Sequence, residues 1–180
     1  MMDYEYYFSI CDKVAEKSKC FSRKIGVLVM TPDYSIINTA YNGPARKVSH
    51  CDSQERLEWL EEQLKDTHVG AVDLYLLDNG YGTKCPRQIL KFKSGEGLHL
   101  CQAAHAERNA IANCAREGIK TKNNWMLMNC SLPCQECSKG IVGAGFSKII
   151  CVEGDDYDKG SRWILNQAGI EIVQIKRQKI

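Results

Sequence analysis

Three features are missing from this sequence of 180 residues. No run approaches the roughly 18 consecutive apolar residues that a membrane span requires, so we expect no membrane partner. The opening residues, MMDYEYYFSI, are acidic and aromatic where a secretory leader would be basic and then apolar, so we expect no leader. The formal net charge is only +2, and the lysines and arginines are scattered. Because a nucleic-acid groove needs a basic stripe, nucleic acid is not an expected partner.

Size and composition are those of an ordinary globular protein. Hydrophobic residues make up 44% of the chain and charged residues 26%. Domains usually have about 100 to 200 residues, which predicts a single domain over residues 1–180 with its own core.

Cysteine is abundant, at ten residues. Without a leader we expect these thiols to be reduced in a cytoplasm (the host cytoplasm if the protein is viral), where metal binding or catalysis is commoner than disulfides. Four of them we interpret as small buried hydrophobic residues. They are Cys11, Cys114, Cys130 and Cys151.

Hydrophobic periodicity predicts the first elements. Residues 3–18 show a helical three-and-four spacing, and the apolar runs IGVLVMT and SIINTAYNG on either side of PDY predict a hairpin. Residues 44–101 break this rhythm with SQERLEWLEEQLK, an expected exposed helix, and then a loose stretch rich in glycine and charge. A structureless stretch of that length is usually functional or an insertion, and we predict an insertion at about 44–101.

Helix and strand patterns alternate in the second half of the chain. We predict helices at 104–117, 134–143 and 159–168, and strands at 124–129, 147–154 and 170–175. Such alternation indicates an α/β fold with parallel strands and helices packed on the sheet.

Two motifs indicate a metal site. HAERNAIANCAREG begins at His105, and PCQEC supplies Cys134 and Cys137 directly after Pro133. Catalytic zinc takes three protein ligands and leaves a fourth position for water, and these three side chains are of the right kinds. We place Pro133 in the first turn of a helix, where its missing N–H costs nothing. The helix N-terminus would also favour the thiolates that zinc needs.

Glu107 lies two residues after His105 and is therefore not placed as a ligand on the same helix face. Zinc lowers the pKa of its bound water to about 7, and a neighbouring carboxylate can accept that proton and return it. Either motif alone also occurs in proteins without such a site, but H-x-E followed by P-C-x-x-C is the signature of zinc nucleobase deaminases.

With these motifs in place, the chain resembles the deoxycytidylate deaminases of phages and eukaryotes, within the zinc-dependent cytidine deaminase superfamily. The resemblance runs nearly end to end, through residues 16–30, AYNGPAR (40–46), the HAE helix, SLPCQECSKGIVGAGFSKIICVE and YDKG…LNQAGIEI. HAE and PCxxC are common to all zinc nucleoside deaminases. YNG (41–43) together with SRK (22–24) narrows the resemblance to the deoxycytidylate branch. The implied fold is a three-layer α/β/α arrangement, with helices flanking a central mixed five-stranded sheet and an insertion between the second strand and the catalytic helix.

The resemblance implies hydrolysis of dCMP to dUMP and ammonia for thymidylate synthesis. Zinc hydroxide would attack C4 while Glu107 protonates N3 and then the departing amine.

The resemblance also implies substrate contacts at five positions. Asn42 matches an asparagine that meets the sugar, although Asn-Gly is also the strongest hairpin dipeptide. Ser22 and Arg23 match a segment around the 5′-phosphate, although an arginine there could equally be a solvated surface charge. Tyr157 matches an aromatic residue near the nucleotide, or is a half-buried tyrosine at a strand end. Ala106 would present its backbone N–H to the base carbonyl.

Members of the family often carry a second, structural zinc. Its matching positions here are Cys20, Cys51 and His99, with His50 or Cys101 competing for the fourth place. The segment GEGLHLCQAAHAE is shorter and differently spaced than the phage pattern, and the two cysteines at 20 and 51 could also be ordinary core thiols.

Regulation is a further implication of the resemblance. Family members are typically hexamers that dCTP activates and dTTP inhibits, with Mg²⁺ on the triphosphate. Asn42, Gly43 and Arg46 would lie near this effector site, where a glycine lets the backbone approach phosphate or simply serves the turn. Some relatives lack this control.

Two other functions compete with this interpretation. The same zinc core would serve a deaminase of another cytosine or adenine nucleotide, or of tRNA or single-stranded DNA, where the base is flipped out. A zinc-stabilised binding module fits less well, because structural zinc is normally closed by four ligands.

Overall fold

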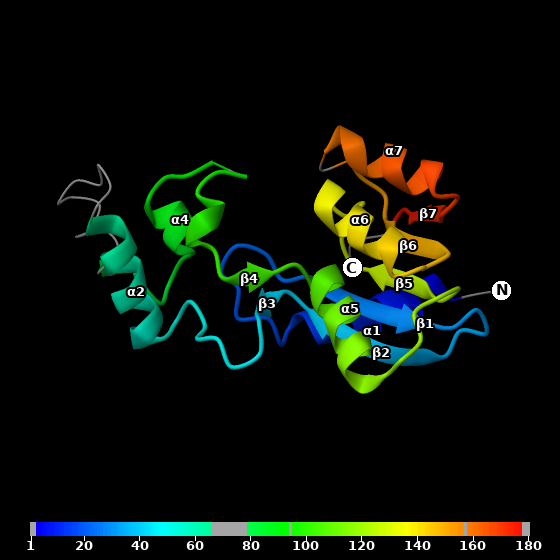
Figure 1. Ribbon diagram of the computed structural model, residues 1–180, viewed down its shortest axis with the longest axis horizontal. Coiled ribbons are helices and arrows are strands. Elements are labelled where there is room, and N and C mark those ends of the chain that lie inside the picture. Colours follow the sequence, from blue (N-terminus) through cyan, green and yellow to red (C-terminus); the bar gives the residue numbers. More distant parts are fainter. Residues whose placement is uncertain (1–2, 66–78, 94, 157, 178–180) are drawn as a thin grey trace. The chain divides into compact units, whose positions relative to one another are not determined.

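The computed structural model describes residues 3–65, 79–93, 95–156 and 158–177 (Figure 1). The chain folds as two compact units. Unit 1 comprises Met1–Ser18, Ile25–Asn42 and His105–Ile180, and unit 2 comprises Lys19–Lys24 and Gly43–Ala104. That residues 1–180 act as a single domain with an insertion at about 44–101 remains our proposal. Within the described ranges, no helix has both the length and the apolar composition to cross a bilayer.

The sheet of unit 1 has five strands, in the order β2-β1-β5-β6-β7. They are β1 (Gly26–Met30), β2 (Ile36–Tyr41), β5 (Trp125–Met128), β6 (Lys148–Val152) and β7 (Glu171–Ile175). Strand β1 pairs antiparallel with both β2 and β5, whereas β5, β6 and β7 run parallel. The predicted hairpin and the predicted parallel strands are therefore confirmed.

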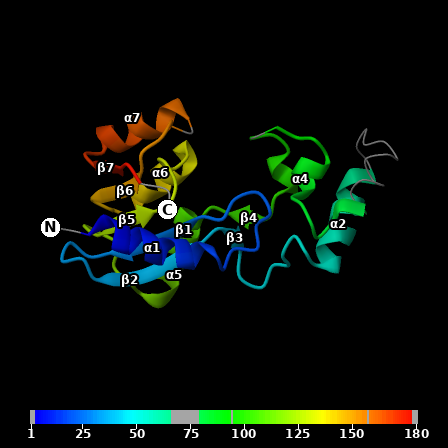
Figure 2. The same cartoon turned by 180° about the vertical axis from the view of Figure 1, so that it is seen from behind.

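Helices cover both faces of this sheet (Figures 1 and 2). They are α1 (Tyr4–Ala15), α5 (Ala106–Glu117), α6 (Gln135–Gly143) and α7 (Lys159–Gln167). Because side chains alternate along a strand, β1 sends Val27 and Val29 toward α5, α6 and α7, and it sends Leu28 and Met30 toward α1. The α/β/α layers with a mixed five-stranded sheet confirm the predicted fold class.

The contact between α1 and the sheet is a close backbone approach. A Cβ atom at Gly26 would lie 2.2 Å from the carbonyl oxygen of Cys11, so only glycine fits there. Asn129, directly after β5, accepts a hydrogen bond from the Gly26 N–H (2.9 Å) and donates one to Asp12 on α1 (2.9 Å). These bonds connect the end of β5 to both β1 and α1.

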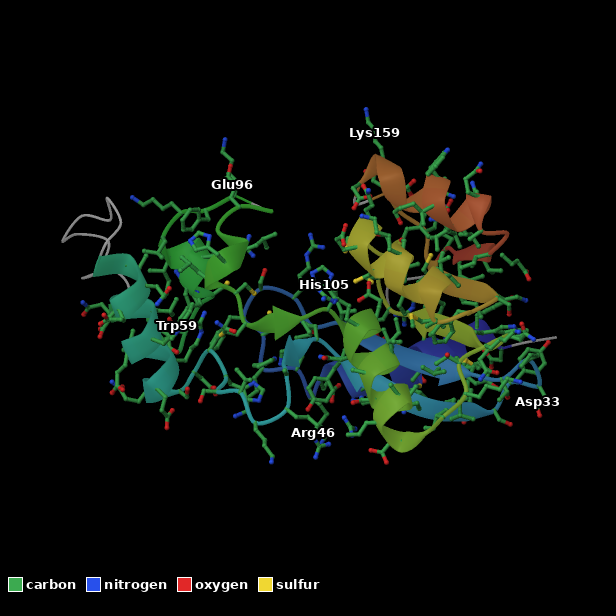
Figure 3. All side chains as sticks on the ribbon, in the orientation of Figure 1. Asp33, Arg46, Trp59, Glu96, His105 and Lys159 are labelled. Carbon is green, nitrogen blue, oxygen red and sulfur yellow. The ribbon has the colours of Figure 1, made fainter. Side chains whose placement is uncertain are left out.

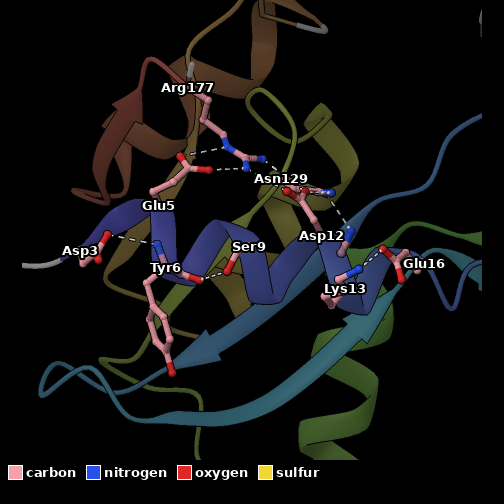
Figure 4. Close-up of polar contacts among 10 residues, drawn as sticks. Asp3, Glu5, Tyr6, Ser9, Asp12, Lys13, Glu16, Asn129 and Arg177 are labelled. Atoms are coloured by element: carbon pink, nitrogen blue, oxygen red, sulfur yellow. Dashed lines mark hydrogen bonds and ion pairs between the residues drawn. The ribbon is translucent and has the colours of Figure 1, made fainter. Parts of the chain in front are cut away.

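Arg177, just after β7, binds two acidic side chains of α1 (Figure 4). Its Nη2 lies 2.7 Å from Glu5 Oε1 and 2.9 Å from Asp12 Oδ2, and its guanidinium lies 4.9 Å from the centroid of the Phe8 ring. The two carboxylates raise the pKa of Arg177, first through the hydrogen bond to Glu5. This contact joins the last strand to the first helix.

Unit 2 has its own small core. Its elements are β3 (Gly43–Pro44), α2 (Gln54–Lys65), α4 (Pro86–Ile89), the 3₁₀ helix η1 (Leu98–Leu100) and β4 (Ala103–Ala104), and β3 pairs antiparallel with β4. The predicted helix at SQERLEWLEEQLK is present, but it is amphipathic rather than exposed, because Leu60 and Leu64 are buried with Leu100. The stretch expected to be loose contains α4, which begins at Pro86 directly after its N-cap Cys85.

Candidate active site

The three predicted zinc ligands converge at the N-termini of two helices. His105 is the N-cap of α5, Cys134 is the N-cap of α6, and Cys137 lies in the first turn of α6. The Nδ1 atom of His105 lies 3.4 Å from the sulfur of each cysteine. Within the described part of the chain, this is the one group of three or more candidate ligands whose atoms all lie within 4.8 Å of one another. Figure 3 shows His105 where α5 begins.

The placement of Pro133 in the first helical turn was wrong. Cys134 has an extended backbone (φ −67°, ψ 164°), so α6 begins only at Gln135 and Pro133 lies before the cap. Its carbonyl oxygen instead accepts a 2.6 Å hydrogen bond from the Ser161 hydroxyl.

The two thiols are coupled through hydrogen bonds. The bond from Cys137 is the largest influence on Cys134 and lowers its pKa, and the same bond raises the pKa of Cys137. The bond to Cys134 also raises the pKa of His105. The pKa values of these three side chains are therefore linked through their mutual contacts.

Glu107 lies beside these ligands in the first turn of α5. Its side chain is buried, with 3% of the residue exposed, and burial raises the pKa of its carboxyl group. His105, Cys134 and Cys137 also affect the pKa of this carboxyl group. Its Oε2 atom has no hydrogen-bond partner among the described residues. A buried polar atom without a partner needs an explanation, and a ligand bound at this site would supply one.

The donor set fits zinc. Zinc–sulfur and zinc–nitrogen bonds of about 2.3 and 2.0 Å place neighbouring ligands of a tetrahedral ion roughly 3.5 Å apart, close to the 3.4 Å found here. Three ligands leave the fourth corner open, and the exposed His105 and half-buried Cys134 lie on the solvent side of the buried Cys137. An open corner is the property of a catalytic rather than a structural zinc.

Asn42 has an internal role. Its side-chain oxygen accepts a hydrogen bond from the Ile25 N–H (2.8 Å), and its backbone carbonyl accepts one from the Ser18 hydroxyl (2.7 Å). It links β2 to the start of β1 instead of forming the tip of a two-residue hairpin, because Gly43 after it begins β3. Contact with a sugar stays a proposal.

The other predicted substrate and effector residues occupy varied environments. Ala106 is the fully buried first residue of α5. Ser22 and Arg23 are exposed on the segment before β1, and Arg46 is exposed after β3. Tyr157 lies outside the described residues.

The residues predicted for a second zinc all belong to unit 2: Cys20, His50, Cys51, His99 and Cys101. Burial is the main cause that raises the pKa of Cys51 to about 11, and Cys101, Cys85 and Cys20 raise it further. These thiols are therefore neighbours of Cys51. None of the ten cysteines forms a disulfide, and Cys11, Cys114 and Cys151 are buried as predicted, whereas Cys130 is only half-buried.

Three polar residues near Cys134 were not predicted from the sequence. They are Ser138, Asp158 and Ser161. The N-cap rule would have found Asp158, which directly precedes the helix predicted at 159–168. No sequence signal pairs the two serines, because they lie on different helices.

Comparison with known proteins identifies the family. The family model for the cytidine and deoxycytidylate deaminase zinc-binding region matches residues 1–153. The chain belongs to this family. The deoxycytidylate deaminase of Enterobacteria phage T4 is 30% identical over 179 residues, covering 93% of this chain and 86% of that protein. The human deoxycytidylate deaminase is 25% identical, covering 92% of this chain and 75% of its own length.

A solved structure shows the same deaminase fold. The crystal structure of dCMP deaminase from cyanophage S-TIM5, in complex with dCMP and dUMP, superposes with a TM-score of 0.62 at 20% identity, covering 97% of this chain and 99% of that one. The family match confirms the resemblance and the enzyme class. The chain is a hydrolytic deaminase.

Proposed function

We propose that this deaminase converts dCMP and water to dUMP and ammonia, with one zinc ion held by His105, Cys134 and Cys137. Phage and eukaryotic relatives named deoxycytidylate deaminase, which match more than nine-tenths of the chain, support the substrate. The convergence of three ligand atoms within 4.8 Å beside the buried Glu107 carboxyl carries the proposal.

Each residue has a separate task in this reaction. When bound, zinc would supply an activated water molecule for attack on the ring carbon that bears the amino group. Glu107 would accept one proton of the attacking water and pass it to ring nitrogen N3. It would then take the second proton from the hydroxyl added to the ring carbon and deliver it to the amine, so that ammonia leaves and the carbonyl forms. Burial shields this carboxyl from bulk water, so the proton stays within the site. The N–H of Ala106, which has no partner within the helix at this first position, donates to the base carbonyl.

The remaining substrate contacts follow from family membership. Asn42 is assigned to the sugar, Ser22 and Arg23 to the 5′-phosphate, and Tyr157 to the nucleotide. The exposure of Arg23 supports its assignment, because a guanidinium forms bidentate hydrogen bonds with phosphate.

Ammonia release tests the substrate. We expect release from dCMP, measured together with the ultraviolet change of cytosine to uracil. Other cytosine and adenine nucleotides, tRNA and a single-stranded oligonucleotide are the comparison substrates. Release from the polymers alone would show that the substrate class is wrong, even with an intact zinc site.

Allosteric control is a separate part of the proposal. We assign the triphosphate effectors dCTP (activator) and dTTP (inhibitor), with Mg²⁺, to the region of Asn42, Gly43 and Arg46. Gly43 is buried in β3, and Arg46 is exposed after it, where a guanidinium can form hydrogen bonds with a triphosphate. Activity measured with and without each effector, in the parent and in Arg46→Ala, tests this: the variant should respond less to both.

A second, structural zinc in unit 2 completes the cofactor proposal. We keep Cys20 and Cys51 as ligands, with His99, His50 or Cys101 for the remaining places. The neighbouring thiols of Cys51 support Cys101, and add Cys85, in preference to the histidines. No three of these sulfur atoms lie within 4.8 Å of one another among the described residues, so they would turn inward on binding.

Arg56 supports this second site. It is 3% exposed, and its Nε and Nη1 atoms have no hydrogen-bond partner among the described residues. Burial lowers the pKa of the Arg56 guanidinium, whereas Cys51 and Cys101 raise it. Metal-bound thiolates at these positions would supply a negative charge beside this buried positive charge. Metal analysis should find two zinc ions per chain in the parent and one in Cys51→Ser. Cys130→Ser, the same change at a half-buried cysteine of unit 1 that belongs to neither proposed ligand set, is the matched control and should keep both.

Assembly and compartment follow family membership alone. We propose a homo-hexamer in the cytoplasm, and light scattering of the purified protein would test the assembly.

A further inference from the structure

Three consecutive backbone groups around Cys134 are each held by α6 or α7. The Pro133 carbonyl accepts from the Ser161 hydroxyl (2.6 Å). The Cys134 carbonyl accepts a hydrogen bond from the Ser138 N–H (2.9 Å), and it lies 3.1 Å from the hydroxyl oxygen of Ser138. The Gln135 N–H donates to Asp158 Oδ2 (2.6 Å). The backbone on both sides of this ligand is therefore restrained.

Two buried hydroxyl groups connect these bonds. Ser138 on α6 and Ser161 on α7 are both fully buried, and their oxygens lie 2.8 Å apart. A hydroxyl has a single hydrogen to donate, and Ser161 uses it on the Pro133 carbonyl. The Ser138 hydroxyl has two acceptors within reach for its own hydrogen, the Ser161 oxygen (2.8 Å) and the Cys134 carbonyl (3.1 Å). The two hydroxyls therefore connect α6 and α7 to the backbone of Pro133 and Cys134.

Asp158 serves two helices at once. Its Oδ1 accepts from the Ser161 N–H (2.9 Å) and caps α7, while its Oδ2 accepts from the first N–H of α6. An ordinary N-cap side chain serves only its own helix. This second bond ties the start of α6 to the start of α7.

We infer that Asp158 and Ser161 are positioning residues that, through the Pro133–Gln135 backbone, aim the Cys134 sulfur at the catalytic zinc. The inference rests on the proposed zinc site. Because Cys134 is a cap with extended backbone dihedrals, the helix alone does not set the direction of its side chain. The polar contacts of α7 set it instead. Outer-shell partners of metal ligands typically change metal affinity or activity by about 10- to 100-fold when they are removed.

Two variants test this inference. Ser161→Ala removes the bond to the Pro133 carbonyl. Asp158→Ser keeps a good cap for α7 but is too short to reach the Gln135 N–H as well. Thr121→Val is the matched control, because its hydroxyl donates a 2.6 Å bond to Ala144 at the opposite end of α6.

The readouts are zinc affinity by chelator competition and the sulfur-to-metal absorption of the cobalt-substituted protein. We expect both variants to bind zinc about 10- to 100-fold more weakly and to change the cobalt spectrum, while Thr121→Val leaves both unchanged. A purely structural role would lower the unfolding temperature of all three variants and leave metal affinity and spectrum at the parent values, and that result would overturn the inference.

These readouts need no substrate. Altered metal binding supports the inference even if dCMP proves to be the wrong substrate, whereas a parent protein that binds no zinc overturns both proposals. If Ser161→Ala does not fold, Asp158→Ser still decides the question.

Discussion

Glu107 shows most clearly how a single residue departs from its ordinary environment. A carboxyl group is rarely buried, and here one oxygen has no hydrogen-bond partner among the described residues. Burial also raises its pKa, so the charged form is disfavoured. Such a group costs stability, and its position beside His105 and Cys137 is the one that its proposed role as proton carrier requires.

The first prediction concerns Glu107→Gln. The amide has nearly the same shape but cannot carry the proton, so we expect zinc content to stay at the parent level while kcat on dCMP falls by about 10²- to 10⁴-fold. Glu117→Gln, at the exposed end of the same helix, is the control and should be fully active. Parent-like turnover by Glu107→Gln would show that this carboxyl is not the proton carrier.

The second prediction concerns Cys11 and Cys151. Burial raises the pKa of each thiol to about 12 from the ordinary 9.0, so both stay protonated and unreactive near neutral pH. Iodoacetamide at pH 8 should leave both unmodified in the folded protein and label both in urea, as peptide mass spectrometry would show. Labelling of the folded protein at the denatured rate would contradict their burial.

The raised pKa values of Cys11 and Cys151 also set the direction in which stability changes with pH. The folded protein holds these two protons where the unfolded chain releases them, so they lower the free energy of unfolding as pH rises above about 9.

At the scale of elements, the packing of α1 on β1 depends on a missing side chain. Gly26 lies against the carbonyl of Cys11 and the backbone nitrogen of Ala15, which belong to the backbone of α1 and cannot rotate away. Asn129 then holds this junction through its bonds to β1 and α1. The helix and the strand are therefore coupled through their main chains.

The third prediction follows from this contact. Gly26→Ala should lower the free energy of unfolding in urea by about 1–3 kcal/mol or more, because α1 must move away from the sheet. Gly143→Ala is the matched control: a Cβ there meets nothing within 4 Å, and alanine favours the helix by about 0.5–1 kcal/mol. Equal stability of the two variants would contradict the close approach.

At the scale of the whole molecule, the zinc site joins two helices that are far apart in sequence. His105 occupies the N-cap position of α5 and Cys134 that of α6, so an ion between them would cross-link two helices that also pack into one hydrophobic core.

The fourth prediction is the effect of metal removal. An ion that binds only the folded state stabilises it, by about 2.7 kcal/mol at 100 times its Kd. Treatment with a strong chelator should therefore lower the unfolding temperature and abolish deamination, and added zinc should restore both. An unchanged melting curve after complete zinc removal would show that the ion does not hold α5 and α6 together.

Much of this molecule was predictable because the signals were local. Apolar, β-branched runs identified β1 and β2, helical spacing identified α1, and the repeated helix–strand pattern identified the parallel strands. His105, Glu107, Cys134 and Cys137 were predictable because metal chemistry restricts both the residue types and their spacing.

The sequence by itself therefore determined the main helices and strands of unit 1, the fold class and three candidate metal ligands, since each depends on patterns of residues close together in the chain. Only the tertiary structure decided that Pro133 lies outside its helix, that Asn42 bonds to Ile25, and that Asp158 caps two helices. The reason is physical: a hydrogen bond between distant segments depends on how packing brings backbone groups together, and no periodicity or spacing records that.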